Sequence, residues 1–169
     1  LGYGITSGST VGIGDGYGAA YPFEVRDTWT IDAIAIWCTS ANAGATAEIG
    51  IYDSSYRGND AVEGPGRLLC VASIATSSTG LKTGTLAAPV TLAPGLYFSA
   101  FANNVAGTTY GGHSVVPHRY HYAAADITDN HQQVGLGFAG STLPQMFTAT
   151  LAALFNTQGP PKFFFRMAS

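Results

Sequence analysis

The sequence predicts an all-β fold, an antiparallel sandwich formed by a single domain. Apolar runs of strand length alternate with loops of Gly, Pro, Asn, Asp and Ser at spacings of about 8–12 residues, which is typical of a sandwich or barrel. Windows with helical periodicity are almost absent, and Gly, Thr, Ser and Val stand where a helix favours Leu, Glu and Lys. The 169 residues fit one domain of ordinary size that can bury a real core.

The N-terminal segment 1–23 is rich in Gly and has no clean alternation of apolar and polar residues. Glycine gives such a segment conformational freedom. We therefore expect an arm or linker that becomes ordered only against neighbouring chains, followed by the sandwich domain at 24–169.

The longest predicted strand, Thr28–Thr39, is apolar on both sides from Ala33 onward, as a strand in the middle of a packed sandwich would be. Alternation along a strand divides its side chains between two faces. One face receives Trp29, Ile31, Ala33, Ala35 and Trp37, and the other receives Ile34, Ile36 and Cys38. We expect the indole of Trp37 to be largely buried.

The remaining strands follow the same pattern of apolar runs and turn residues. They are predicted at Ala45–Tyr52, Arg67–Ala75, Gly80–Leu86, Val90–Leu92, Leu96–Ala102 and Lys162–Met167, with weaker signals at Thr108–Val116, Arg119–Tyr122 and Val134–Phe138. Pro94-Gly95 predicts a type II turn, with Pro at its second position and Gly at its third. The segment Thr142–Phe155 fits a helix and a strand equally well.

A cassette of turn and strand residues extends over about a third of the chain, from Ile49 to Asn103. Its parts are Gly50-Ile51-Tyr52-Asp53, Gly64-Pro65-Gly66, Leu68-Leu69, Ser78-Thr79-Gly80 and Leu92-Ala93-Pro94-Gly95-Leu96-Tyr97. This order resembles the jelly-roll-like distal domains of phage tail fibres and other phage virion proteins. The resemblance contains no known active-site motif.

The resemblance implies a jelly-roll-like antiparallel β-sandwich and a non-enzymatic structural protein of the phage virion. The first expectation within that class is a tail-fibre or receptor-binding domain for host attachment, and the second is a capsid decoration or head-fibre protein. The implied partners are further copies of the chain in a homotrimer, other virion proteins, and a glycan or protein of the host cell surface. A carbohydrate-binding module or lectin is the alternative from another class, because it uses the same sandwich.

The composition is consistent with an assembling protein. Charged residues make up 10% of the chain, far below the usual quarter. Such a chain cannot cover its surface with charge. It must expose hydroxyls, backbone and aromatic edges, or bury part of its surface against other subunits.

The charge pattern argues against nucleic-acid and membrane partners. The net charge is −3 and the seven Lys and Arg residues are scattered, whereas binding to phosphates needs a concentrated positive surface. No apolar run approaches the roughly 20 residues that span a bilayer. The N-terminal residues show no charged region followed by an apolar one, so no signal peptide is expected.

We expect no catalytic residues, no cofactor and no metal. The chain has no GxSxG motif for a nucleophile, no recognised pair of carboxylates and no metal-ligand spacing of Cys and His. The loop that begins at Asp53 is rich in oxygen ligands but lacks the carboxylates of a calcium loop. Cys38 and Cys70 fit two buried free thiols or one disulfide between strands.

The candidate recognition or assembly surface is the segment that follows the cassette, where aromatic, imidazole and guanidinium groups gather. These groups offer stacking faces and hydrogen bonds for a sugar or a protein surface. Packing of a long loop onto the sandwich or onto a neighbouring subunit is the alternative. The candidate residues are Tyr110, His113, His118, Arg119, Tyr120, His121 and Tyr122.

Overall fold

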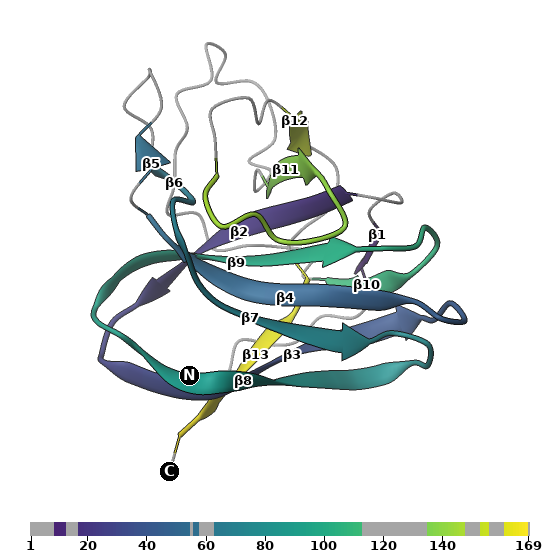
Figure 1. The fold of residues 1–169 in the computed structure, drawn as a ribbon, viewed down its shortest axis with the longest axis horizontal. Coiled ribbons are helices and arrows are strands. Elements are labelled where there is room, and N and C mark those ends of the chain that lie inside the picture. Colours follow the sequence, from purple (N-terminus) through teal and green to yellow (C-terminus); the bar gives the residue numbers. More distant parts are fainter. Residues whose placement is uncertain are drawn as a thin grey trace.

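The computed structural model describes residues 9–12, 17–54, 56–57, 63–112, 135–147, 153–155 and 161–168. Within these residues the regular structure consists of β-strands, and two antiparallel sheets pack face to face (Figure 1). A short two-stranded ladder, β5 (Tyr56–Arg57) with β6 (Glu63–Gly64), stands apart from both sheets. The predicted all-β antiparallel sandwich is confirmed.

The first sheet, named here the β4 sheet, has the strand order β12-β11-β2-β9-β4-β7. Its strands are β12 (Ala153–Phe155), β11 (Gly135–Ala139), β2 (Tyr17–Val25), β9 (Gly95–Asn103), β4 (Thr46–Asp53) and β7 (Leu68–Ala75). The predicted strands at 45–52, 67–75, 96–102 and 134–138 are therefore confirmed with small changes of boundary.

The second sheet, named here the β3 sheet, is centred on one long strand. Its strands are β1 (Ser9–Gly12), β10 (Thr109–Gly112), β3 (Trp29–Ser40), β13 (Phe163–Met167) and β8 (Gly80–Leu92). β8 pairs with one edge of β3. The other edge of β3 pairs with β13 along Ile31–Ile36 and with β10 near Cys38, and β1 pairs with β10.

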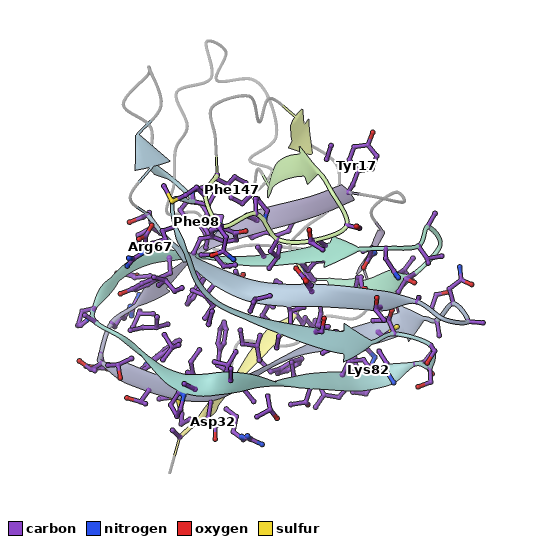
Figure 2. The ribbon with its side chains drawn as sticks, in the orientation of Figure 1. Tyr17, Asp32, Arg67, Lys82, Phe98 and Phe147 are labelled. Carbon is purple, nitrogen blue, oxygen red and sulfur yellow. The ribbon has the colours of Figure 1, made fainter. Side chains whose placement is uncertain are left out.

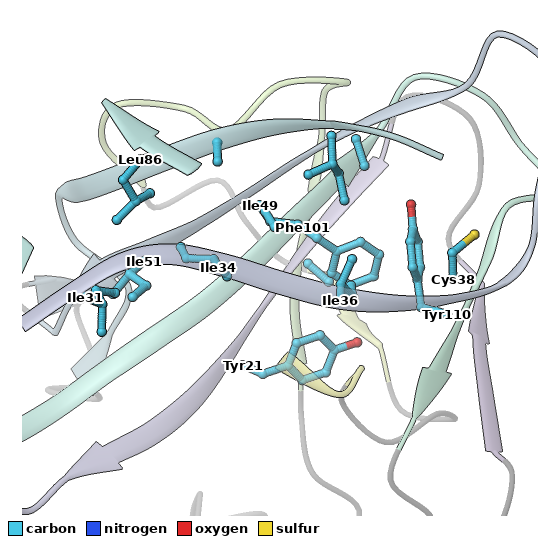
Figure 3. Close-up of a cluster of buried hydrophobic side chains, with 14 of the residues drawn as sticks. Tyr21, Ile31, Ile34, Ile36, Cys38, Ile49, Ile51, Leu86, Phe101 and Tyr110 are labelled. Atoms are coloured by element: carbon cyan, nitrogen blue, oxygen red, sulfur yellow. The ribbon is translucent and has the colours of Figure 1, made fainter. Parts of the chain in front are cut away.

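The main core lies between the two sheets, as Figure 3 shows. β3 contributes Ile34, Ile36 and Cys38, and β4 contributes Ile49 and Ile51, all with essentially no exposed surface. The predicted assignment of Ile34, Ile36 and Cys38 to one face of their strand is confirmed. Full burial of an Ile side chain contributes about 1.5–3 kcal/mol, so this layer is the main source of stability.

A β-bulge at Asp32 changes the predicted faces of β3. Ala33 pairs with Arg166, and Ile31 pairs with the next residue of β13, Met167, so Asp32 is one extra residue in β3. On the other side of β3, residues 86–89 of β8 lie between the partners of Ile31 and Ala33. An extra residue in a strand reverses the alternation. Ile31 therefore joins the core, and Trp29 packs against it, while Trp37 points outward and is 46% exposed. The expectation that Trp37 is largely buried is wrong because the outer side of the β3 sheet at Trp37 is open to solvent among the described residues.

Two predicted strands form one continuous strand in the structure. The segments 80–86 and 90–92 were expected to be separate, but they form the single strand β8, whose residues 86–89 lie opposite the register shift. The predicted strand at 108–116 is confirmed as β10 for residues 109–112. The strand predicted at 119–122 lies outside the described residues.

The predicted N-terminal arm is wrong for residues 17–23. These residues belong to β2, which lies between β11 and β9 in the β4 sheet. Ala19 and Tyr21 face the main core and Ala20 faces a second cluster, so both sides of the strand are buried. A strand that is buried on both sides shows no alternation in sequence. Pro22 pairs with Phe98 of β9 and lies beyond the described residues that pair with β11.

Two local predictions are also corrected. Gly95 does not have the positive φ that a type II turn requires, so the Pro94-Gly95 turn is of another kind. Instead, the Tyr97 hydroxyl donates a hydrogen bond to the Ala93 carbonyl at 3.0 Å and closes the connection between β8 and β9. In the segment 142–155, the described residues 142–147 form no helix and residues 153–155 form β12.

Candidate interaction surface

The structure places Tyr110, the first residue of the predicted recognition segment, inside the core. Its ring packs edge-on against Phe101 with centroids 5.1 Å apart, and its hydroxyl donates to Asn103 Oδ1 at 2.5 Å. Burial raises the pKa of Tyr110 above its ordinary value. Tyr110 is therefore not available to a receptor, and its inclusion in a contact surface is wrong. His113, His118, Arg119, Tyr120, His121 and Tyr122 lie outside the described residues.

The outer face of the β4 sheet is apolar but covered by the chain itself. Tyr52 and Phe98 point away from the main core into a second cluster, which Leu143 and Phe147 close from outside. The rings of Tyr52 and Phe147 meet edge-on at 4.8 Å. Phe98 and Phe147 lie together on the upper side of the molecule in Figure 2.

Hydrogen bonds hold the segment 142–147, named here the cover, against the β4 sheet. The Tyr52 hydroxyl donates to the Pro144 carbonyl at 2.6 Å, and the Leu143 amide donates to Glu48 Oε2 at 2.7 Å. The Phe147 amide donates to the Gly66 carbonyl at 3.0 Å. The segment 142–147 is thus held by side chains of β4 and by the loop before β7.

The outer face of the β3 sheet, on the opposite side, is named here the Trp37 face. It consists of the outward side chains Thr30, Asp32, Ala35, Trp37, Thr39, Leu81, Thr83, Thr85, Thr91, Thr109, Phe164 and Arg166. Trp37 pairs with Leu81, and Ala35 pairs with both Thr83 and Phe164. Trp37, Leu81 and Phe164 are 46%, 50% and 45% exposed, respectively.

Gly111 makes room for the indole of Trp37. A Cβ atom on Gly111 would lie 3.4 Å from Trp37 Cδ1 and 3.7 Å from Thr39 Cγ2, in van der Waals contact with both. One edge of the indole therefore rests on β10. The rest of the ring system remains open to solvent on the Trp37 face.

The polar groups of the Trp37 face bond to one another. Arg166 Nε donates to Asp32 Oδ1 at 2.6 Å, across the β-bulge. The hydroxyls of Thr39 and Thr109 lie 2.9 Å apart, and those of Thr30 and Thr91 lie 3.0 Å apart. The hydrogen bond and the charge of Asp32 both raise the pKa of the Arg166 guanidinium, which stays charged.

Sequence reasoning missed this surface because it read the apolar pattern of residues 33–37 as burial on both sides. A usable signal was present on the neighbouring strands. In KFFFRM, Phe164 alternates with two core-facing phenylalanines, and in GLKTGT, Leu81 shares a face with Thr83 and Thr85. Hydroxyl residues beside single large apolar residues indicate a solvent-facing side of a sheet.

The described residues include both cysteines and six of the ten acidic residues of the chain. No group of three or more His, Cys, Asp or Glu residues that could hold a metal occurs among them. Cys38 and Cys70 are both free thiols. Burial raises the pKa of Cys38, and it raises the pKa of Cys70 to about 11, so both thiols are protonated at neutral pH.

Asp53, the first residue of the loop that is rich in oxygen ligands, has a structural role. Its Oδ1 accepts a hydrogen bond from the Arg67 amide at 2.8 Å, and its Oδ2 lies 3.8 Å from Arg67 Nε. These contacts join the end of β4 to the start of β7. The carboxylate therefore stabilises a strand connection.

The described residues contain no helix that is long and apolar enough to cross a membrane.

Comparison of the chain with protein-family models, with curated proteins and with solved structures gives no match.

Proposed function

We propose that this chain is a non-enzymatic structural protein of a phage virion, and first of all a tail-fibre or receptor-binding domain for host attachment. The observation that carries the proposal is the position of the cassette in the fold. Its parts fall on four strands that follow one another in the two main sheets, β4, β7, β8 and β9, and on the turns between them. The resemblance therefore rests on one continuous structural unit.

The cassette residues have structural reasons for their identity. A Cβ atom on Gly50 would lie 2.5 Å from the Cys70 carbonyl oxygen and 2.8 Å from Leu143 Cδ1, so only glycine fits between β7 and the cover. Gly80 has a φ of 102°, which favours glycine at the start of β8. These requirements support the cassette as a folding unit and add no chemistry to it.

The strand order supports the jelly-roll part of the proposal. With the eight strands β1, β2, β3, β4, β7, β8, β9 and β10 numbered from one to eight, the β3 sheet contains the order 1-8-3-6 and the β4 sheet the order 2-7-4-5. A double-sheet jelly roll consists of eight strands in two Greek keys. Such modules form capsid and lectin domains, although a fold alone does not fix a function.

A capsid decoration or head-fibre protein is the alternative within the same class, and it differs in its position on the particle. A carbohydrate-binding module or lectin is the candidate from another class. The exposed rings of Trp37 and Phe164 favour this second candidate, because aromatic faces can stack on sugars. The same rings also fit a protein contact.

Location on the particle tests the proposal. Antibody fragments against the purified chain, imaged on virions by electron microscopy, should bind at the tail tip for a receptor-binding domain. Binding over the head would favour the decoration protein. Absence of the chain from purified particles, shown by mass spectrometry of their proteins, would contradict the virion proposal altogether.

We also propose that the chain assembles with itself, as a homotrimer. The low content of charged residues supports this, because the chain has few groups with which to keep its whole surface hydrated. Native mass measurement should show a trimer at micromolar concentration. A stable monomer under those conditions would contradict self-assembly.

A further inference from the structure

We propose that the Trp37 face is the surface through which one copy of this chain binds a second copy. The inference rests on the proposed self-assembly and assigns that assembly to particular residues. It fixes one side of the contact. In a dimer two such faces meet, whereas in a ring each face meets a different surface of the next subunit.

The first reason is the concentration of exposed apolar area. Trp37, Leu81 and Phe164 come from three adjacent strands, point to the same side and are each about half exposed. Monomeric soluble proteins rarely expose contiguous apolar patches of more than a few hundred Å². Single exposed apolar residues are ordinary, but neighbours on three adjacent strands form a patch.

The second reason is that the chain packs its own residues against the apolar side chains of the opposite face. The chain covers the outer face of the β4 sheet with its own residues, through Leu143, Phe147 and the bonds from Tyr52 and Glu48. Trp37, Leu81 and Phe164 keep about half of their surface exposed, so the described residues do not give the Trp37 face an equivalent cover. An apolar sheet face is stabilised when it is packed against another layer.

The third reason is that six of the eight polar side chains of the face already bond to one another. Asp32 is bonded to Arg166, Thr39 to Thr109, and Thr30 to Thr91. Burying a polar group is costly when it loses its hydrogen bonds to water without replacement. These groups keep their partners when a second subunit covers them.

The charge and size of the face also suit a second copy. The Asp32–Arg166 pair is neutral as a unit, and Lys82, which pairs with the core residue Ile36, does not belong to this face. Three strands spaced about 4.8 Å apart and the 12 residues of β3 give a flat area of roughly 550 Å². The relief of the side chains raises this toward the roughly 800 Å² that one partner contributes to a standard interface.

A sugar is the less suitable occupant. Recognition of a sugar needs free donors and acceptors beside the ring on which it stacks. Trp37 is instead flanked by Leu81 on β8, and Phe164 lies one residue pair away on the far side of β3. The nearest hydroxyl groups on the same strand side, those of Thr39 and Thr109, already bond to each other at 2.9 Å.

The test compares one chemical change on the two outer faces. Thr83 lies on the Trp37 face beside Leu81 and opposite Ala35, Thr46 lies on the outer side of the β4 sheet, and both threonines are exposed. Thr83→Lys places an unpaired ammonium group in the proposed contact and should raise the dissociation constant of the oligomer at least about 100-fold. Thr46→Lys carries the same charge and should leave it unchanged. Sedimentation velocity gives the oligomeric state, and the melting temperature verifies the fold.

The double variant Leu81→Thr with Phe164→Thr gives an independent measurement that removes apolar area without adding charge. It should also dissociate the oligomer, and it decides the matter if Thr83→Lys fails to fold. An oligomer that tolerates both changes overturns the inference, as does equal dissociation by Thr46→Lys. A wild-type monomer whose binding to host-cell glycans is lost in the double variant also overturns it and assigns the face to a sugar.

This experiment is separate from the one on the particle. A trimer that persists in both the Thr83→Lys variant and the double variant contradicts the assignment of the Trp37 face. It does not affect the virion proposal. Absence of the chain from virions contradicts the virion proposal and leaves a measured contact between copies intact.

Discussion

The outer faces of the two sheets resemble each other in composition but differ in what covers them. The β4 sheet presents Tyr52 and Phe98 on its outer side, and the segment 142–147 closes over them. The β3 sheet presents Trp37, Leu81 and Phe164, and each remains about half exposed. The two apolar outer faces of this molecule therefore differ in whether the chain itself packs against them. One face is completed within the chain, and the other is suited to a contact outside it.

The largest expected effect separates the same residue type on the two faces. Phe147→Ala should lower the free energy of unfolding by about 3–5 kcal/mol, because Phe147 is buried against Tyr52 and its loss leaves a cavity. Phe164→Ala should cost far less, because Phe164 is 45% exposed. Urea unfolding at low protein concentration measures both. Equal losses would show that the two faces do not differ in the single chain.

The pH dependence of stability in the alkaline range tests whether thiol and phenol groups are buried. Burial raises the pKa of Cys70 from 9.0 to about 11, so the folded state holds this proton more tightly than the unfolded state does. The resulting stability is present below pH 9 and is lost as pH rises toward 11, by roughly 3 kcal/mol for two pKa units. Burial likewise raises the pKa of Tyr52, which lies beneath the cover. It raises the pKa of Tyr21 to about 12.

The measurement is the melting temperature between pH 8 and pH 11. It should fall steadily in the wild type, and Cys70→Ala should flatten the part between pH 9 and pH 11. A melting temperature that is constant over this range, or a Cys70→Ala curve parallel to that of the wild type, would contradict burial of the thiol.

Trp37→Ala tests the bare face directly. We expect a loss of about 1–2 kcal/mol in the free energy of unfolding, well below the 3–5 kcal/mol of a fully buried aromatic residue, because the indole is half exposed. The part that is lost comes from the edge that rests on Gly111. Unfolding of the domain by this substitution would mean that Trp37 belongs to the core after all.

The smallest effect concerns one bond of the cover. Tyr52→Phe removes the hydroxyl that donates to the Pro144 carbonyl at 2.6 Å but keeps the ring. The expected loss in the free energy of unfolding is about 1 kcal/mol, the usual net contribution of a hydrogen bond. Tyr97→Phe is the control, because it removes a similar bond to Ala93 in an exposed turn and leaves the cover intact. The cover should become more open to proteases only in the first variant.

The sequence by itself determined the fold class and most of the strands of the main sheets. Alternating or continuous apolar runs, separated by Gly and Pro, specify strands locally, so β4, β7, β9 and β13 were found close to their observed limits. The set of core residues at Ile34, Ile36 and Cys38 also follows from period-two alternation. Gly80 of the cassette has a role that depends on local backbone geometry, because its φ is 102°.

The tertiary structure decided which side of a strand is the inside. The bulge at Asp32 reverses the alternation of β3, and it depends on the different registers of β8 and β13 along the same strand. Burial of β2 on both sides depends on distant residues, because Leu143 and Phe147 cover the sheet from a position far along the chain. The candidate surface escaped prediction for the same reason. The exposure of a side chain depends on which layers pack against its strand. The sequence of a single strand does not specify the layer that lies opposite.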